Sequence, residues 1–277
     1  MKFWKYGRVV LALIGAIVLG LSITCCGVYT SGYMYVTGAQ YNQIGAFKID
    51  HDFGYLTPVT GQPFASAGNN PVQAVVIPGG RFLATVNKGS GDVSIYTIGG
   101  AGTLYYQASY ATSGSNPVSI GMNPTGNFLY VVDQNAPPDI VNGVDLNAGR
   151  GDITVFQIDP STGRLTLITN QNTFNTNGSQ LPYFMVNYKP VQIISSGGGS
   201  GAYVYVLDQA YAAGSIDPSV PAACMNAPAG SPCTTPDVFL YAISSSNGQL
   251  TLTQNTALTL PTLPGAASTI YTSGKYV

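Results

Sequence analysis

The sequence has no glutamate, one histidine and one tryptophan among its 277 residues. Its eleven acidic residues are all aspartates, and charged residues make up 8% of the chain, against about 25% in an average soluble protein. The net charge of −1 leaves no basic stripe that could neutralise phosphates, which argues against a nucleic-acid partner. The single histidine, His51, stands in a turn between two predicted strands, where a solvated side chain is expected. There is no Gly-x-Ser-x-Gly elbow and no zinc-binding motif, so the sequence offers few groups for catalysis.

What the chain does contain is typical of a turn-rich β-protein. It has 34 glycines, 18 prolines and 19 tyrosines, and 45% of its residues are hydrophobic. Recurrent apolar runs exclude a disordered chain. Low charge combined with many Gly, Thr, Tyr and Asn residues favours an all-β protein that works outside the cytosol. No stretch after Leu21 has a sustained 3.6-residue period, so essentially no helix is expected.

Residues 1–25 are expected to be an export signal. Three basic residues within the first eight positions precede an apolar run of thirteen residues, 9–21, and a membrane-spanning helix needs about twenty. The Cys25-Cys26-Gly27 step that follows resembles a bacterial lipobox, in which Cys26 would be lipidated. An ordinary cleavage site or a short uncleaved anchor is the alternative. We therefore expect an exported protein, either a cell-envelope lipoprotein held on the membrane only by its lipid or a periplasmic or extracellular protein.

Four segments of the remaining chain align as an internal repeat. Each begins with an alternating aromatic and aliphatic strand and continues into a second strand that ends with an aromatic residue and an Ile. A Gly-x-Leu turn follows, and a Pro-led strand closes the unit. The first strands are 33–36, 82–85, 128–131 and 203–206, the second strands are 44–49, 93–98, 153–158 and 238–243, and the Pro-led strands are 71–77, 117–122, 190–195 and 264–270.

The spacing of these repeats predicts a β-propeller. The first strands start 49, 46 and 75 residues apart, the last spacing being lengthened by insertions. Four short strands in roughly 45 residues is the spacing of a four-stranded antiparallel blade, and stacked blades would cover both apolar faces of each sheet. A β-sandwich is the competing all-β fold, but it does not account for four matched repeats. The predicted blades, within a repeat region 26–277, are 33–80, 81–126, 127–199 and 200–274, with a fifth starting at 275.

The repeat resembles the lactonase-type seven-bladed β-propellers, the family of 6-phosphogluconolactonase-like proteins. The resemblance rests on Tyr35–Gly38 (YVTG), Tyr130–Asp133 (YVVD), Tyr205–Asp208 (YVLD), Asn123–Val131 (NPTGNFLYV) and Phe156–Thr166 (FQIDPSTGRLT). It implies a propeller fold and hydrolysis of a sugar-derived lactone. Because these motifs are structural, and because family sites that rely on Glu or His cannot be carried over, the resemblance assigns no catalytic residue.

The strand positions at which the chain begins and ends within the repeat predict an incomplete array of blades. When the Pro-led strand is taken as the innermost of each blade, as in the family that the repeat resembles, the strands 33–36, 82–85, 128–131 and 203–206 count as the second strands of their blades. The chain then enters at the second strand of its first blade and stops at Val277, two residues into another second strand. Seven blades would need roughly 330 residues after an export signal. We therefore expect a fragment of a longer reading frame, an open arc of three full blades flanked by partial ones, with unpaired edges that favour association. The full-length ring is expected to be a monomer.

Three insertions are expected to rise on one rim of the propeller. Residues 133–152 and 208–237 follow second strands, and 170–189 precedes an inner strand, so all three should emerge on the same face. Long loops on one rim are where propellers carry function, here binding of a small molecule or a glycan, although tolerated surface insertions would look the same. Within the second insertion, Cys224 and Cys233 are expected to form a disulfide in an oxidising compartment.

The 133–152 insertion is rich in Asp and Asn. Its Asp145-x-Asn147-x-Gly149-x-x-Asp152 segment offers oxygens of the kind that calcium prefers, but the sixth-position Gly and terminal Glu of an EF-hand are missing. An ordinary Asx-rich turn is the favoured interpretation, and no metal or cofactor is predicted.

Lactone hydrolysis needs a base or an activated water, and a cation beside the developing oxyanion. The candidates on the long-loop rim are Lys88, Asp133, Arg150, Asp152, Lys189 and Asp208. Each is equally explicable as a solvated or turn-capping residue. Three hypotheses stay open: a lactone hydrolase, a non-catalytic cell-envelope scaffold that binds a glycan, peptide or protein, and a structural surface protein that assembles through strand edges.

Overall fold

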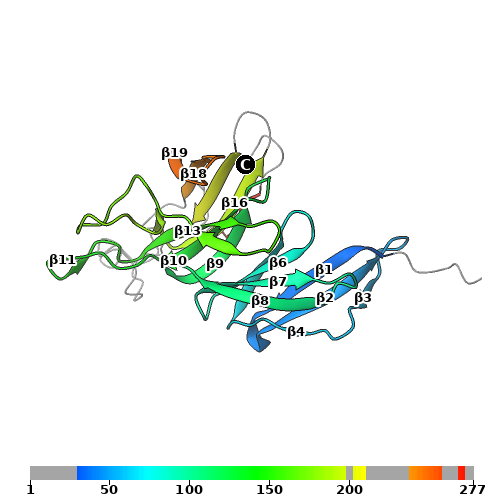
Figure 1. Cartoon of the computed structure of the whole chain (residues 1–277). Helices are drawn as coiled ribbons and strands as arrows, with labels where there is room; N and C mark the ends of the chain where they lie inside the picture. The colour runs from blue at the N-terminus through cyan, green and yellow to red at the C-terminus, as the bar shows by residue number, and fades with distance from the viewer. Residues whose placement is uncertain (1–29, 198–201, 210–236, 258–267, 272–277) are drawn as a thin grey trace, which may run out of the picture.

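The computed structural model describes residues 30–197, 202–209, 237–257 and 268–271. These residues form four antiparallel sheets that follow one another along the chain as an open row of blades (Figure 1). The only helix among them is the 3-10 turn η1 (Ala39–Tyr41), and none is long and apolar enough to cross a membrane. The predicted all-β fold with four-stranded antiparallel blades is confirmed.

The second sheet shows the blade in its simplest form, with the order β5-β6-β7-β8. Its strands are β5 (Pro71–Val76), β6 (Phe82–Asn87), β7 (Asp92–Ile98) and β8 (Leu104–Ala111). Every residue of β6 is buried, because blades stack against both faces. Phe82 and Ala84 pack into the core shared with the third sheet, whereas Leu83 packs into the core shared with the first.

The other three sheets repeat this plan. The first contains β1 (Thr30–Gly38), β2 (Gln43–Asp50), β3 (Leu56–Pro58) and β4 (Phe64–Ala65). The third contains β9 (Ser115–Met122), β10 (Phe128–Asn135), β13 (Arg150–Ile158), β14 (Leu165–Leu167) and β15 (Phe184–Tyr188), with a separate hairpin of β11 (Ile140–Val141) and β12 (Val144–Asp145). The fourth contains β16 (Pro190–Gly197), β17 (Ala202–Asp208), β18 (Asp237–Ile243) and β19 (Leu250–Ala257). The repeat strands predicted from the sequence are therefore confirmed, except for the last Pro-led strand, 264–270, whose described residues 268–270 belong to no strand.

Neighbouring blades are joined by an aromatic ring that packs on a glycine. The ring begins the second strand of one blade, and the glycine belongs to the Gly-x-Leu turn of the next. A Cβ added at the glycine would come within 3.0 Å of the ring, so no larger residue fits there. The pairs are Tyr33 with Gly102, Phe82 with Gly163, and Phe128 with Gly248. The leucine two residues further on is buried in each joint, at 6% exposure for Leu104, 4% for Leu165 and 5% for Leu250.

The inner strands are linked by polar side chains that accept a hydrogen bond from the next inner strand. The bonds run from the N–H of Ile120 to Gln73 Oε1 (3.0 Å), from that of Ile193 to Ser119 Oγ (3.2 Å), and from that of Ile270 to Gln192 Oε1 (2.6 Å). Residues 268–271 thus lie at an inner position beside β16. Because Ile270 takes the place of Ile120 and Ile193, the Pro-based alignment of the last strand is three residues out of register.

The 170–189 insertion lies against the 133–152 insertion, as predicted, since Thr176 Oγ1 donates to Asp139 Oδ1 at 2.8 Å and Asn147 Nδ2 donates to the Tyr183 hydroxyl at 3.0 Å. It leaves its sheet at a different point from the one predicted. The chain leaves the outer edge of the third sheet at Ile168, whose N–H bonds Val155 O at 2.8 Å, and returns at Phe184, opposite Ile153. The insertion is therefore an excursion from the middle of the outer strand, and β15 separates it from the inner strand. The outer edge of the first sheet is divided in the same way between β3 and β4. An edge strand has one hydrogen-bonded neighbour, so an interruption there disturbs the fewest contacts.

Candidate functional site

Asp133 and Asp152 face each other where the 133–152 insertion leaves its blade. They are direct partners in the register of β10 and β13, and each has 0% of its surface exposed. Antiparallel pairing puts the end of one strand opposite the start of the next, whatever the length of the loop between them. Two of the predicted candidates are thereby brought together.

Only one oxygen of each carboxyl group in the pair accepts a hydrogen bond from a described residue. Thr112 Oγ1 donates to Asp133 Oδ1 at 2.9 Å, and Thr154 Oγ1 donates to Asp152 Oδ2 at 3.5 Å. Asp133 Oδ2 and Asp152 Oδ1 have no hydrogen-bond partner among the described residues. Gly114 covers them closely: a Cβ there would overlap the free Asp152 oxygen and lie 2.8 Å from Asp133 Cβ. The two carboxyl groups are therefore enclosed in the joint between the second and third blades.

Burial changes the acidity of both groups. It raises the pKa of Asp133 to about 7, although the Thr112 hydrogen bond works in the opposite direction. Burial, and then the charge of Asp133, raise the pKa of Asp152 well above its usual range. Two neighbouring carboxylates cannot both ionise cheaply in a buried place, so near neutral pH the pair holds a proton between two acids.

A second group of charges occupies the next blade. Asp208, at the end of β17, is 2% exposed, and neither of its carboxylate oxygens has a described partner. Burial and the nearby Asp237 raise its pKa to about 8, while the Arg150 guanidinium lowers it. Arg150 is half-buried and lies two residues before Asp152 on β13, so it belongs to both groups. Arg150 is thus a predicted cation that acts on a candidate aspartate.

These acids lie at equivalent places in their blades, where the second strand ends beside the start of the third strand. The paired residues are Gly38 with Gln43, Asn87 with Asp92, and Asp133 with Asp152. In the fourth sheet Asp208 and Asp237 flank the last pair in register, Leu207 with Val238. In the second sheet the pair consists of an amide and an acid that are hydrogen-bonded to each other: Asn87 Nδ2 donates to Asp92 Oδ1 at 2.6 Å. In the third and fourth sheets both members are acids, so the same position changes from a structural pair to an acidic one.

The two predicted lysines lie elsewhere along the rim. Lys88 is half-buried, and its N–H bonds Asn70 O at 2.9 Å. Lys189 is half-buried in a left-handed conformation with φ of 49°, just before Pro190. Its carbonyl oxygen accepts a hydrogen bond from the N–H of Gln209 at 3.1 Å, directly after Asp208.

The calcium-like segment forms an Asx turn, as favoured from the sequence. Asp145 Oδ1 accepts hydrogen bonds from the N–H groups of Asp139 (3.0 Å) and Asn147 (2.9 Å), so its oxygens serve the loop itself. Within the described ranges no three potential metal ligands of the His, Cys, Asp or Glu type come together. His51 is 66% exposed in its turn and lies 3.1 Å from Asp52 Oδ1.

The predictions on cysteines lie outside the described residues. Lipidation of Cys26 and the Cys224–Cys233 disulfide therefore stay predictions, as does the position of most of the 208–237 insertion.

Sequence reasoning missed the residues that enclose the acid pair, namely Thr112, Gly114 and Thr154. A signal for the glycine exists, because Gly-x-Asn-Pro occurs at 68–71 and again at 114–117. In the first copy, Gly68 packs on Asn87 in the same way as Gly114 packs on the aspartates.

Residues 28–151 match the sequence model of a family described as lactonase, 7-bladed β-propeller. They include the first two sheets and the strand pair that carries Asp133. No curated protein sequence matches the chain.

Solved structures agree with a β-propeller fold. Two proteins provisionally named 6-phosphogluconolactonases, from Bacteroides uniformis and Bacteroides fragilis, each give a TM-score of 0.55, at 16% and 19% identity. Each match covers 82% of this chain and 52% of the other, so this chain spans about half the length of these relatives. Identity at this level shows the fold alone.

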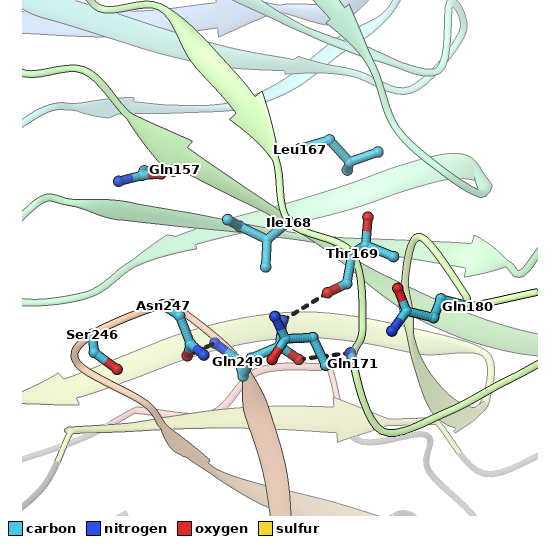
Figure 2. A pocket seen from close by; sticks show the side chains of 9 residues that line it. All are labelled: Gln157, Leu167, Ile168, Thr169, Gln171, Gln180, Ser246, Asn247 and Gln249. Atoms are coloured by element: carbon cyan, nitrogen blue, oxygen red, sulfur yellow. Dashed lines mark hydrogen bonds between the residues drawn. The ribbon is translucent and has the colours of Figure 1, made fainter.

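The third and fourth blades also form an open, uncharged groove at their outer edge. It has a volume of about 480 Å³ and lies where the mid-strand excursion of the third sheet meets the β18–β19 turn (Figure 2). Gln249 fixes one wall: its Nε2 donates to Thr169 O at 2.6 Å, and its Oε1 accepts from Gln171 N–H at 3.0 Å. The remaining lining is mostly amide side chains, from Gln157, Gln180 and Asn247.

Proposed function

We propose that this chain is a lactonase-type β-propeller that hydrolyses a sugar-derived lactone. The observation that carries the proposal is the buried Asp133–Asp152 pair, with one unbonded oxygen on each residue. An unsatisfied buried polar group costs about 1–3 kcal/mol, so the pair is a poor choice for packing alone. Acids with strongly shifted pKa values beside a loop-bearing rim are typical of functional sites. The family of residues 28–151, and the names of the two Bacteroides proteins, support a lactone as the substrate class.

The pair would act as a general base. Near neutral pH one carboxylate of the pair accepts a proton from a water molecule, and the resulting hydroxide adds to the lactone carbonyl carbon. The ring C–O bond then breaks, and the departing oxygen takes the proton back, so that one water is added and a hydroxy acid is released. Arg150 supplies the nearby positive charge for the carbonyl oxygen as it becomes negative. Because both aspartates are fully enclosed, the reaction requires the segment around Gly114 to move aside.

The test is hydrolysis of a panel of sugar lactones by the full chain, compared with its Asp152→Asn variant. We expect a loss of about 100-fold or more in kcat, because removal of a general base has an effect of this size. Asp52→Asn is the matched control, since Asp52 is an exposed turn residue that lies outside the acid pair. Unchanged turnover in Asp152→Asn would refute the assignment of the base.

A second function, non-catalytic binding of a neutral glycan, is favoured by the amide-lined groove. Amide groups pair well with hydroxyl groups, and Leu167 adds an apolar surface for the C–H face of a sugar ring. Titration with cellotriose would test this, with Gln180→Ala expected to abolish binding and the exposed Gln107→Ala to leave it unchanged. Saturable binding without turnover of any lactone would favour this function over hydrolysis.

We also propose that the chain is exported and anchored through Cys26. The support is the basic start, the thirteen-residue apolar run and the Cys-Gly step of the sequence. Cys26→Ser should release the protein from the membrane fraction. Equal membrane recovery of both forms would exclude a lipid anchor at this residue.

A further inference from the structure

The 133–152 insertion carries two aspartates besides the acid pair, Asp139 and Asp145. Asp139 directly precedes β11 and Asp145 ends β12, in the hairpin that projects from the third sheet (Figure 1). The N–H of Asp139 donates to Asp145 Oδ1 at 3.0 Å, and both residues are half-buried. The two carboxylates are therefore held at neighbouring positions of one loop.

Tyr183 connects this loop to the acid pair. Its hydroxyl accepts a hydrogen bond from Asn147 Nδ2 at 3.0 Å, and it is 3% exposed. The residue before it, Pro182, has a carbonyl oxygen that accepts a hydrogen bond from Ser113 Oγ at 2.9 Å. Ser113 directly precedes Gly114, which covers the acid pair. The loop and the cover of the acid pair are therefore both bound to two consecutive residues.

The charges of three aspartates act together at this point. Burial raises the pKa of the Tyr183 hydroxyl, and the Asn147 hydrogen bond lowers it. The negative charges of Asp152, Asp139 and Asp145 raise it further. One member of the acid pair and both loop aspartates thus lie close enough to act on the same hydroxyl group.

Positive charge is scarce in this part of the sequence. The three insertions contain seven of the eleven aspartates but two of the ten basic residues, Arg150 and Lys189. Arg150 already acts on an acid, because its charge opposes the rise that burial causes in the pKa of Asp208. Proteins commonly hold a phosphate group with Arg or Lys side chains. The excess of negative charge on the insertions is therefore unfavourable for a ligand that carries a phosphate.

We infer that Asp139 and Asp145 make this site selective for uncharged sugar lactones over phosphorylated ones. The inference rests on the proposed hydrolysis at the acid pair and names its substrate class. A phosphate monoester carries a charge of about −1.5 to −2 at neutral pH, and its repulsion by the two aspartates lowers kcat/KM. An uncharged lactone is not repelled, and its hydroxyl groups can donate hydrogen bonds to carboxylate oxygens.

The experiment compares kcat/KM of the full chain for glucono-1,5-lactone and for the 6-phosphate ester of this lactone. At an ionic strength of about 10 mM, where the screening length is about 30 Å, kcat/KM for the phosphorylated lactone should be at least about tenfold lower. Salt at about 1 M shortens the screening length to about 3 Å, so the difference between the two substrates should shrink.

A double variant, Asp139→Asn with Asp145→Asn, tests the two residues directly. Asparagine keeps the Oδ1 atoms that accept hydrogen bonds from Thr176 and from the N–H of residue 139, while two negative charges are removed. The ratio of kcat/KM for the phosphorylated lactone to that for the uncharged one should rise at least about threefold at low salt. Asp52→Asn with Asp159→Asn is the matched control, since it removes the same charge from turns on the opposite rim and should not change this ratio.

Thermal unfolding followed by circular dichroism establishes that both double variants are folded. An equal or higher kcat/KM for the phosphorylated lactone in the unchanged chain, or an unaltered ratio in the Asp139→Asn, Asp145→Asn variant, would overturn the selectivity and leave the proposed hydrolysis standing. No turnover of either lactone by the unchanged chain would overturn both.

Discussion

The Asp133–Asp152 pair should make the protein less stable as the pH rises from about 4 to about 7. In the unfolded chain Asp133 ionises near its ordinary pKa of 3.8, whereas burial raises the pKa to about 7 in the folded state. Between these values the folded state keeps a proton that the unfolded state has released. The free energy of unfolding is therefore highest in acid and falls as the pH rises through the folded pKa.

The size of this effect follows from the shift. The pKa of Asp133 moves by about three pH units, and one unit corresponds to about 1.4 kcal/mol, so Asp133 alone should remove at most about 4 kcal/mol of stability. Asp152, whose pKa is raised as well, acts in the same direction. Asp208, with a pKa raised to about 8, acts in the same direction at slightly higher pH. The lowered pKa of Asp159, about 2, affects stability only in stronger acid.

The assay is urea unfolding of the full chain at several pH values between 4 and 8. The Asp133→Asn, Asp152→Asn double variant carries no titrating group in the pair, so its stability should depend much less on pH. Asp52→Asn, which alters an exposed acid, should keep the slope of the unchanged chain. A stability that is constant or rises between pH 5 and 7, or an equal slope in the double variant, would refute the reasoning.

Further predictions concern the residues around the site. Gly114→Ala should destabilise the fold by about 1–3 kcal/mol because its Cβ overlaps the acid pair, whereas Gly100→Ala, with nothing within 4 Å, should not; equal urea midpoints would contradict this. Thr112→Val removes the hydrogen bond that lowers the pKa of Asp133, so the folded pKa should rise further and the loss of stability should extend to a higher pH than in the unchanged chain. The same dependence of unfolding free energy on pH in both proteins would count against the Thr112–Asp133 hydrogen bond. Gln249→Ala removes two hydrogen bonds to the mid-strand excursion and should cost about 1–3 kcal/mol in urea unfolding, so an unaltered midpoint would show that these bonds are not stabilising.

The fold could be predicted because the residues that join the blades recur in the sequence. Tyr33, Phe82 and Phe128 each pack on a glycine of a Gly-x-Leu turn, so the same contact marks every repeat. The exit point of the 170–189 insertion could not be predicted, since a sequence does not reveal whether a loop interrupts a strand or follows it. The register of the last inner strand was misjudged because a proline, rather than the Gln192–Ile270 contact, defined the alignment.

The site was predicted only in part. Asp133 and Asp152 were both named as candidates, but their eighteen-residue separation concealed that they are cross-strand partners. Gly114, which directly precedes β9 of the same sheet, packs on both aspartates, and no local sequence pattern reveals this contact. Arg150 was named for its charge, yet its influence on Asp208 arises only where two blades meet.

The most direct test of the proposed hydrolysis is the pH dependence of glucono-1,5-lactone opening by the full chain, measured as acid release above the spontaneous rate. We predict that kcat/KM rises through a pKa of about 7, the value to which burial raises Asp133, and that the Asp133→Asn, Asp152→Asn variant loses this rise together with at least about 100-fold of the rate. The same rate and pH profile in the double variant, or no turnover by the unchanged chain on any sugar lactone, would contradict the account.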